Sequence, residues 1–100
     1  MATTSQAKYF AGGRFTLPDR MAIECLEPLY QEMRKVVSRK RKSVVIDSGE
    51  VAVIDAAGVQ LLVAFIRELG TKGCEVSWDN YSVQIHQLSE EMGVVDVLDF

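Results

Sequence analysis

The spacing of apolar residues changes in the middle of the chain, where a strand pattern gives way to a helix pattern. Residues 51–54 form a short apolar run that suits a buried strand. Further on, apolar side chains recur every three or four residues, as on one face of a helix that we expect over residues 57–69. The chain is therefore predicted to pass from a strand into a helix through a short loop. The apolar side chains of that helix are Val59, Leu62, Ile66 and Leu69.

The loop between this strand and this helix consists of small residues. Asp55 suits the N-cap position, because its carboxylate can accept a hydrogen bond from a backbone N–H group of the first helical turn. Ala56, Ala57 and Gly58 follow, and residues this small let another backbone approach closely. We therefore expect a protein-docking surface at residues 55–60. A larger side chain at Gly58 is expected to weaken binding more than folding.

The first part of the chain predicts a hairpin followed by a helix. Two short extended runs, residues 8–11 and 14–17, flank Gly12–Gly13, a pair that is typical of a tight hairpin turn. A helix is expected from residue 25 or 26 to about residue 38, because apolar residues recur on one face. Pro28 is compatible with it, since a missing N–H group costs nothing in the first turn.

Four consecutive cations, Arg39–Lys42, follow this helix, and Arg34 and Lys35 lie one turn earlier. Cations in this position complement the negative end of the helix dipole. We favour this structural interpretation over a docking patch, which stays open as the alternative.

The second half of the chain predicts two more strands and a third helix. Residues 43–47 are a continuous apolar run closed by a carboxylate, which indicates a central strand covered on both faces or next to a layer of helices. Residues 74–78 alternate as a further strand. Ser82 is a good N-cap for the third helix and Gly93 a good C-cap. Residues 94–98 are expected to form a strand or a last short helix.

Because strand and helix patterns alternate, the predicted fold class is α/β, with a mixed sheet and helices packed against it. The helices that begin near residues 57 and 83 should both pack on the sheet that holds residues 44–46 in its middle. Gly70 and Gly73 are expected to close the helix before them in a left-handed conformation. We expect residues 1–8 to be disordered and residues 9–100 to form one domain.

Composition excludes several functions. The chain has 100 residues, 48% of them hydrophobic, which is enough for one core, and its net charge of -3 argues against nucleic acid as the main partner. No apolar run approaches the length of a membrane span, and residues 1–6 lack the layout of a signal peptide, so we expect a cytoplasmic protein without direct membrane insertion. Cys25 and Cys74 are expected to be reduced packing residues.

Candidate chemistry is sparse. Asp47 and Asp55 close neighbouring segments and could pair for acid–base work, but without a nearby His or Lys they are expected to be loop caps, and no catalysis is predicted. His86 is the only histidine, and no Cys or His lies at ligand spacing, so no metal site is expected. The glycines have no nucleotide-binding spacing, and no cofactor is expected. Trp78 and Tyr81 could anchor an interface, although a core or rim position is the default.

Three segments, in this order and spacing, resemble the STAS domain, the module shared by bacterial anti-sigma factor antagonists and the cytoplasmic tails of sulfate transporters. They are Val44–Asp47, Ile54–Leu62 and Leu88–Val94, and the resemblance extends from about Gly13 to Leu98. It implies a four- or five-stranded mixed sheet with three or four helices. It also implies a function in binding other proteins rather than in catalysis.

One departure from the family pattern concerns regulation. In the regulated members the loop reads Asp-Ser-Ser-Gly or Asp-Ser-Thr-Gly, and a partner kinase phosphorylates the first serine to release the bound target. Here Ala56 occupies that position and Ala57 the next, so this switch cannot operate at the loop. The loop is similar to that of a subgroup that includes the small STAS subunit of a bacterial lipid-transport ATP-binding cassette system.

The resemblance leaves two kinds of partner open. One is an anti-sigma factor or a related serine kinase-like ATPase, and the other is the ATP-binding subunit of a lipid transporter. The sequence does not separate them, because each requires a protein surface and no chemistry of its own. Both would use the adjoining helix face and the loop residues Asp55, Ala56, Ala57, Gly58, Val59 and Gln60.

Overall fold

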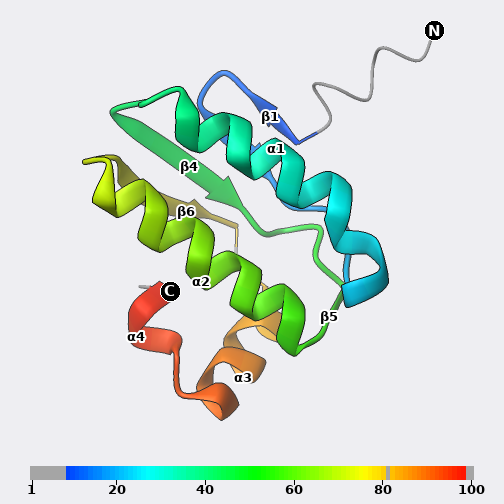
Figure 1. Ribbon diagram of the computed structural model, residues 1–100. Coiled ribbons are helices and arrows are strands. Elements are labelled where there is room, and N and C mark those ends of the chain that lie inside the picture. Colours follow the sequence, from blue (N-terminus) through cyan, green and yellow to red (C-terminus); the bar gives the residue numbers. More distant parts are fainter. Residues whose placement is uncertain (1–8, 81, 99–100) are drawn as a thin grey trace, which may run out of the picture.

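A four-stranded mixed sheet forms one layer of the protein in a computed structural model that describes residues 9–80 and 82–98 (Figure 1). Its strands are β1 (Phe10–Ala11), β2 (Arg14–Thr16), β4 (Ser43–Asp47) and β6 (Glu75–Asp79). They lie in the order β1-β2-β4-β6, with β1 antiparallel to β2 and the other two pairs parallel. The prediction of a central strand at residues 43–47 is confirmed, and Ile46 is fully buried. The predictions for residues 1–8 lie outside the described residues.

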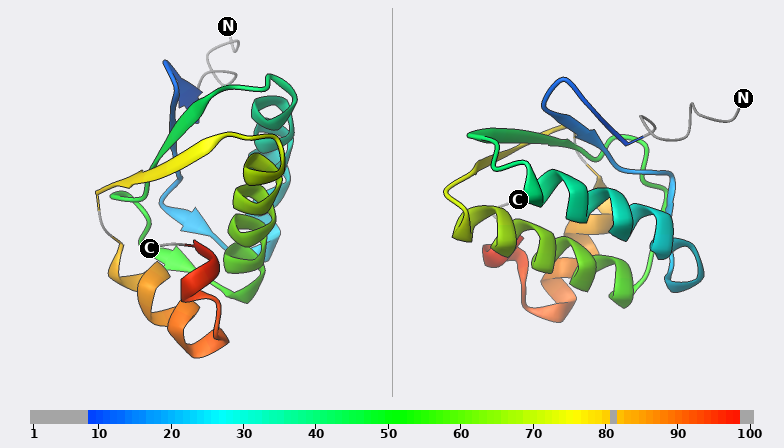
Figure 2. Two further views of the ribbon diagram at one scale, coloured as in Figure 1. Left: turned by 90° about the vertical axis from the view of Figure 1, so that its left-hand side faces the viewer. Right: turned by 45° about the horizontal axis from the view of Figure 1, so that its top comes forward.

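Two long helices, α1 (Leu26–Ser38) and α2 (Ala56–Thr71), cover one face of this sheet and run side by side in the same direction (Figures 1 and 2). Burial alternates along the strands: Val44 and Ile46 are buried, whereas Val45 between them is only half-buried. Of the two alternatives for β4, the structure therefore has a strand next to a helix layer. Within the core, the ring of Phe15 from β2 meets that of Phe65 from α2, with centroids 5.1 Å apart.

The last two helices, α3 (Val83–Met92) and α4 (Val95–Leu98), both lie against α2 (Figure 2). The main contacts of α3 are with α2, α4 and the short strand β5 (Val53–Ile54). The expectation that it packs on the four-stranded sheet is therefore wrong. Residues 95–98 are helical, which decides between the two alternatives for the C-terminal segment.

Most of the turns and helix caps predicted from the sequence are confirmed. Gly12 and Gly13 have φ values of 62° and 83°, as a tight hairpin turn requires. The Ser82 hydroxyl accepts a hydrogen bond from the N–H group of Ile85, and Gly93 closes α3 with a φ of 75°. Helix α2, however, continues through Gly70 to Thr71, so the predicted left-handed glycine is Gly73 alone.

The strand expected at residues 51–54 is shorter and more exposed than its apolar sequence indicates. Only Val53–Ile54 form a strand, β5, which pairs in parallel with β3 (Arg20–Met21) in a separate two-stranded sheet. Val51 is buried, but the side chain of Val53 is 43% exposed. Because β5 leads directly into α2, this small sheet fixes the position of the loop at residues 55–60.

Candidate docking surface

Asp55 joins two elements that are distant in the sequence. The N–H group of Gly58 donates a hydrogen bond to Oδ1 of Asp55 at 3.0 Å, so Asp55 is the N-cap of α2 as predicted. The N–H group of Ile23 donates to Oδ2 at 2.9 Å, and Ile23 begins the short 3-10 helix η2 (Ile23–Cys25). These hydrogen bonds, that from Ile23 above all, lower the pKa of Asp55 below its usual value. The carboxylate thus fixes the start of α2 against η2.

This network gives Asp55 a pH-dependent effect on stability. The pKa of Asp55 is lower in the folded protein, so its contribution is complete above the unfolded pKa of about 3.9 and is lost as the pH falls through the folded value. We expect Asp55→Asn to melt at a lower temperature than the parent at pH 7, because the Ile23 N–H group loses its charged acceptor. Melting curves from pH 7 to 2 should show this difference shrinking below about pH 4. An equal difference at every pH would contradict this assignment.

Gly58 contacts another part of the chain, not the solvent. It is buried, and a Cβ atom at this position would collide with the carbonyl oxygen of Met21 in β3 and would lie 2.9 Å from Cγ1 of Ile54. The close backbone approach that the small residues allow is therefore internal, because the first turn of α2 packs on β3. The expectation that Gly58→Leu impairs binding while sparing the fold is wrong for this reason.

The remaining residues of the predicted loop divide into buried and accessible ones. Val59 has no exposed surface, so it supports the helix from within. Ala56 is the first residue of α2 and is exposed, as is Gln60, while Ala57 is half-buried. Asp55 is half-buried like Ala57, so the face that a partner can reach here consists of Asp55, Ala56, Ala57 and Gln60.

A shallow apolar depression extends this face toward α1. Its volume is about 440 Å³, and its lining includes Ala57, Gln60 and Leu61 from α2 with Ile23 and Tyr30 from the other side. Ile23 is 69% exposed and Tyr30 41%, and because both line the same depression they form an exposed apolar patch. Neither residue was predicted to belong to a site. The available signal was that Tyr30 lies at the edge of the apolar face of its helix and that Ile23 precedes that helix.

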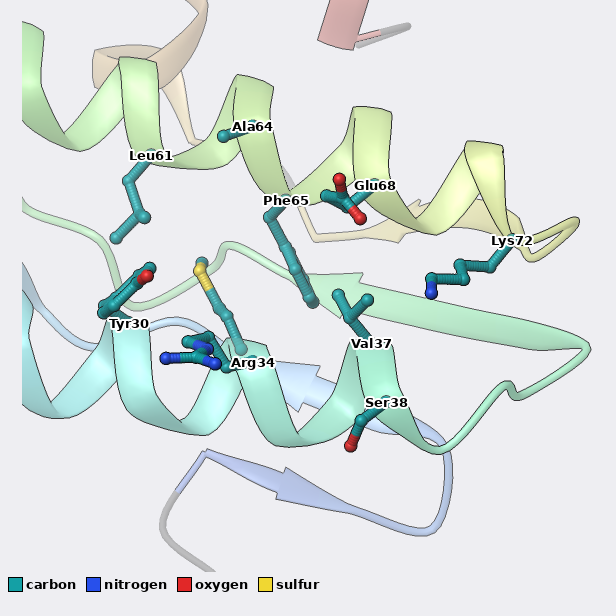
Figure 3. A pocket seen from close by; sticks show the side chains of 10 residues that line it. Tyr30, Arg34, Val37, Ser38, Leu61, Ala64, Phe65, Glu68 and Lys72 are labelled. Atoms are coloured by element: carbon teal, nitrogen blue, oxygen red, sulfur yellow. The ribbon is translucent and has the colours of Figure 1, made fainter.

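A second depression continues the first between α1 and α2 (Figure 3). It has a volume of about 410 Å³ and shares Tyr30 and Leu61 with the first, so that the two form one groove along the helix pair. Phe65 and Val37 approach each other at its floor, and the charged side chains of Arg34, Glu68 and Lys72 lie along its sides (Figure 3). We call the two depressions together the interhelical groove.

Asp47 and Asp55 do not share partners, so the structure does not bring together the candidate carboxylate pair. Asp47 accepts hydrogen bonds from the N–H group of Gly49, from Asn80 and, at 2.7 Å, from Arg14. Although burial opposes ionisation of Asp47, these hydrogen bonds outweigh it and lower its pKa. Each aspartate serves as a cap or ion-pair partner with a separate set of residues.

Arg14 joins the ends of two strands on the face of the sheet that α1 and α2 leave open. Its guanidinium lies 2.7 Å from Asp47 and 2.5 Å from Asp79. The hydrogen bond to Asp79, followed by that to Asp47, raises the pKa of Arg14. This ion cluster links β2, β4 and β6, so its role is structural.

The other candidate residues also have structural roles. Trp78 is half-buried, and its indole N–H group donates to the carbonyl oxygen of Leu98 at 2.8 Å, whereas Tyr81 lies outside the described residues. His86 is partly exposed, with Nε2 3.5 Å from a carboxylate oxygen of Glu90. Cys25 and Cys74 are free thiols, and burial raises the pKa of Cys74.

The described part of the chain has neither a metal-binding cluster nor a membrane-spanning helix. No group of three His, Cys, Asp or Glu side chains there could hold a metal ion. Among the same residues, no helix is long and apolar enough to cross a bilayer.

The four-stranded mixed sheet and its helices make this a small α/β domain. The family model described as "Mlab, STAS domain" matches residues 7–99. The chain therefore belongs to the STAS domain family, whose members are in general protein-interaction modules without catalysis. No curated protein matches the chain.

Proposed function

We propose that this domain is a non-catalytic cytoplasmic module that binds an ATPase-type protein through the start of α2. The observation that carries the proposal is that Ala57 and Gln60 line one apolar depression with exposed Ile23 and Tyr30, while exposed Ala56 precedes Ala57 in the chain. Aromatic and large aliphatic side chains at the centre of such a surface are typical anchors of protein interfaces. Asp55 holds the two parts of this surface together through its two hydrogen bonds.

One class of partner is an anti-sigma factor or a related serine kinase-like ATPase. The resemblance of the loop to that of anti-sigma factor antagonists supports it. Ala56 takes the place of the regulatory serine, so a complex of this kind would not be released by phosphorylation at the loop.

A second candidate partner is the ATP-binding subunit of a lipid-transport ATP-binding cassette system. The same substitution favours it, because a permanent subunit needs no hydroxyl by which a kinase could release it. In this role the domain would be a structural subunit, and the interhelical groove would extend the contact along α1 and α2.

Photo-crosslinking in living cells tests the proposal and separates the two partners. A photoreactive amino acid in place of Gln60, which is exposed near the start of α2, should crosslink to one protein, to be identified by mass spectrometry. The matched control carries the same group at Ser77, which is exposed on β6. A transporter ATP-binding subunit or a kinase-like ATPase captured from Gln60 but not from Ser77 is the expected result. Equal capture from both positions, or none from Gln60, would refute docking through this loop.

A further inference from the structure

The end of the molecule opposite the loop at residues 55–60 carries a dense group of cations. Six exposed side chains contribute to it: Lys35 in the last turn of α1, the four of residues 39–42 in the connection to β4, and Lys72 at the end of α2. In the left view of Figure 2 this connection lies at the top, whereas β3, β5 and α3 lie at the bottom. We call the group the basic pole.

The charges of the basic pole are not neutralised within the described part of the chain. None of its six cations takes part in an ion pair there. Glu68, one turn before Lys72, and Glu75, whose N–H group donates to the carbonyl of Lys42, are carboxylates close to the pole in the chain. The pole thus carries a positive excess on a protein whose net charge is -3.

Two of these cations are held in place by the hairpin. The guanidinium carbons of Arg39 and Arg41 lie 5.9 Å and 5.3 Å from the centre of the Phe10 ring. Arg41 also lies against the hairpin turn, since a Cβ atom on Gly13 would be 2.9 Å from its Nη2 atom. Because these contacts limit side-chain freedom, less entropy is lost when the charges meet a ligand.

The helix dipole accounts for only part of this group. Cations favour a helix C-terminus mainly within the last turn, and the last turn of α1 contains Lys35 alone. Helix α1 ends at Ser38, and Lys40 then turns the chain with a φ of 55°. Residues 40–42 lie beyond the reach of the dipole, so their charge calls for a different explanation.

We infer that the basic pole binds the surface of a lipid bilayer that contains anionic phospholipids. A group of four to eight Lys and Arg side chains is the size that attracts such a surface. Nucleic-acid-binding domains are usually basic as a whole, but this chain has an isoelectric point of about 5.1. A flat membrane meets only the protruding pole, whereas a long polyanion would also run past the acidic remainder of the molecule.

The acidic side chains at the far end of the molecule lie too far from the basic pole to weaken its contact with a membrane. The molecule measures 38 Å along its longest axis, and the Debye length at physiological salt is about 8 Å. The carboxylates Glu24, Glu27 and Asp55 belong to the far end, where α1 and α2 begin, and are screened from a membrane at the pole. Lys72 belongs both to the basic pole and to one end of the interhelical groove. The depression at the other end of the groove, lined by Ile23, Ala57 and Gln60, stays open in this orientation, so the inference is independent of the proposed function.

Co-sedimentation with vesicles tests the inference. The full chain should bind vesicles of phosphatidylcholine with phosphatidylglycerol at low salt, and pure phosphatidylcholine vesicles should not retain it. The double variant Lys40→Asn with Lys42→Gln should bind about 30-fold more weakly, since each cation contributes about fivefold. Salt near 1 M, at which the Debye length is about 3 Å, should release the parent protein.

The matched control is Gln84→Glu with Gln87→Glu, which changes the net charge by the same amount on exposed positions of α3. It should bind anionic vesicles as the parent does. Equal weakening in both double variants would show a mere effect of net charge and would overturn the inference. It would also be overturned if the parent did not bind anionic vesicles, or if a DNA or RNA duplex bound the pole more tightly than the vesicles.

Discussion

Replacing Gly58 with alanine is expected to lower the free energy of unfolding by about 1–3 kcal/mol, the range for overpacking a close contact. Alanine is the better helix former by about 1 kcal/mol, so propensity alone predicts the opposite sign. The loss arises because the new Cβ atom would collide with the carbonyl oxygen of Met21, a backbone atom that cannot rotate away. Leucine should destabilise further, since it adds three more carbon atoms at the same contact.

Gly70 provides the matched control, because it lies in the same helix and has open space where a Cβ atom would be placed. Gly70→Ala should raise the free energy of unfolding by about 0.5–1 kcal/mol. Urea unfolding of the parent and both variants measures the two effects. If Gly58→Ala were as stable as the parent, α2 would not pack on β3 as described.

A glutamate in place of Ala56 is expected to leave the domain folded but to weaken partner binding about 100-fold or more. Ala56 is exposed in the first turn of α2, where free N–H groups and the helix dipole favour an anion. In a docked interface the same charge would lose its hydration, and without a cation opposite it the net effect is unfavourable. Ala56→Ser should keep the partner and offer a hydroxyl to a kinase.

Titration calorimetry with the partner identified by crosslinking decides this prediction, beside a melting curve for each variant. Gln87→Glu on α3 is the control, because it adds the same charge at an exposed position away from the loop. Full affinity in Ala56→Glu would remove the start of α2 from the contact surface.

Elements with local signals could be predicted from the sequence. Gly12–Gly13 define the hairpin, and Ser82 and Gly93 bound α3, because a cap or a turn depends on residues a few positions apart. The apolar run of β4 likewise predicted the central strand, because the pattern lies within five consecutive residues. Its neighbours in the sheet, however, follow from pairings with residues about thirty positions away in either direction.

Features that depend on long-range packing could not be predicted. The tight contact at Gly58 involves Met21, which lies far away in the sequence, so three small residues in a row indicated close approach without saying to what. The apolar depression has the same origin, because Ile23 and Leu61 meet only after η2 and α2 have packed together. The small residues of the loop predicted a docking surface but not the partner that binds there, and that partner stays a proposal.

The order of the strands has a consequence for synthesis on the ribosome. Strand β2 pairs with β4, and β3 pairs with β5, so apart from the pairing of β1 with β2 these N-terminal strands find their neighbours only among residues 43–54. The hairpin at residues 10–16 therefore leaves the exit tunnel with one edge unpaired until β4, about thirty residues further along the chain, has been synthesised. During that interval Phe10 and Phe15 lack the core that later covers them, which makes the nascent N-terminal segment a natural target for chaperones.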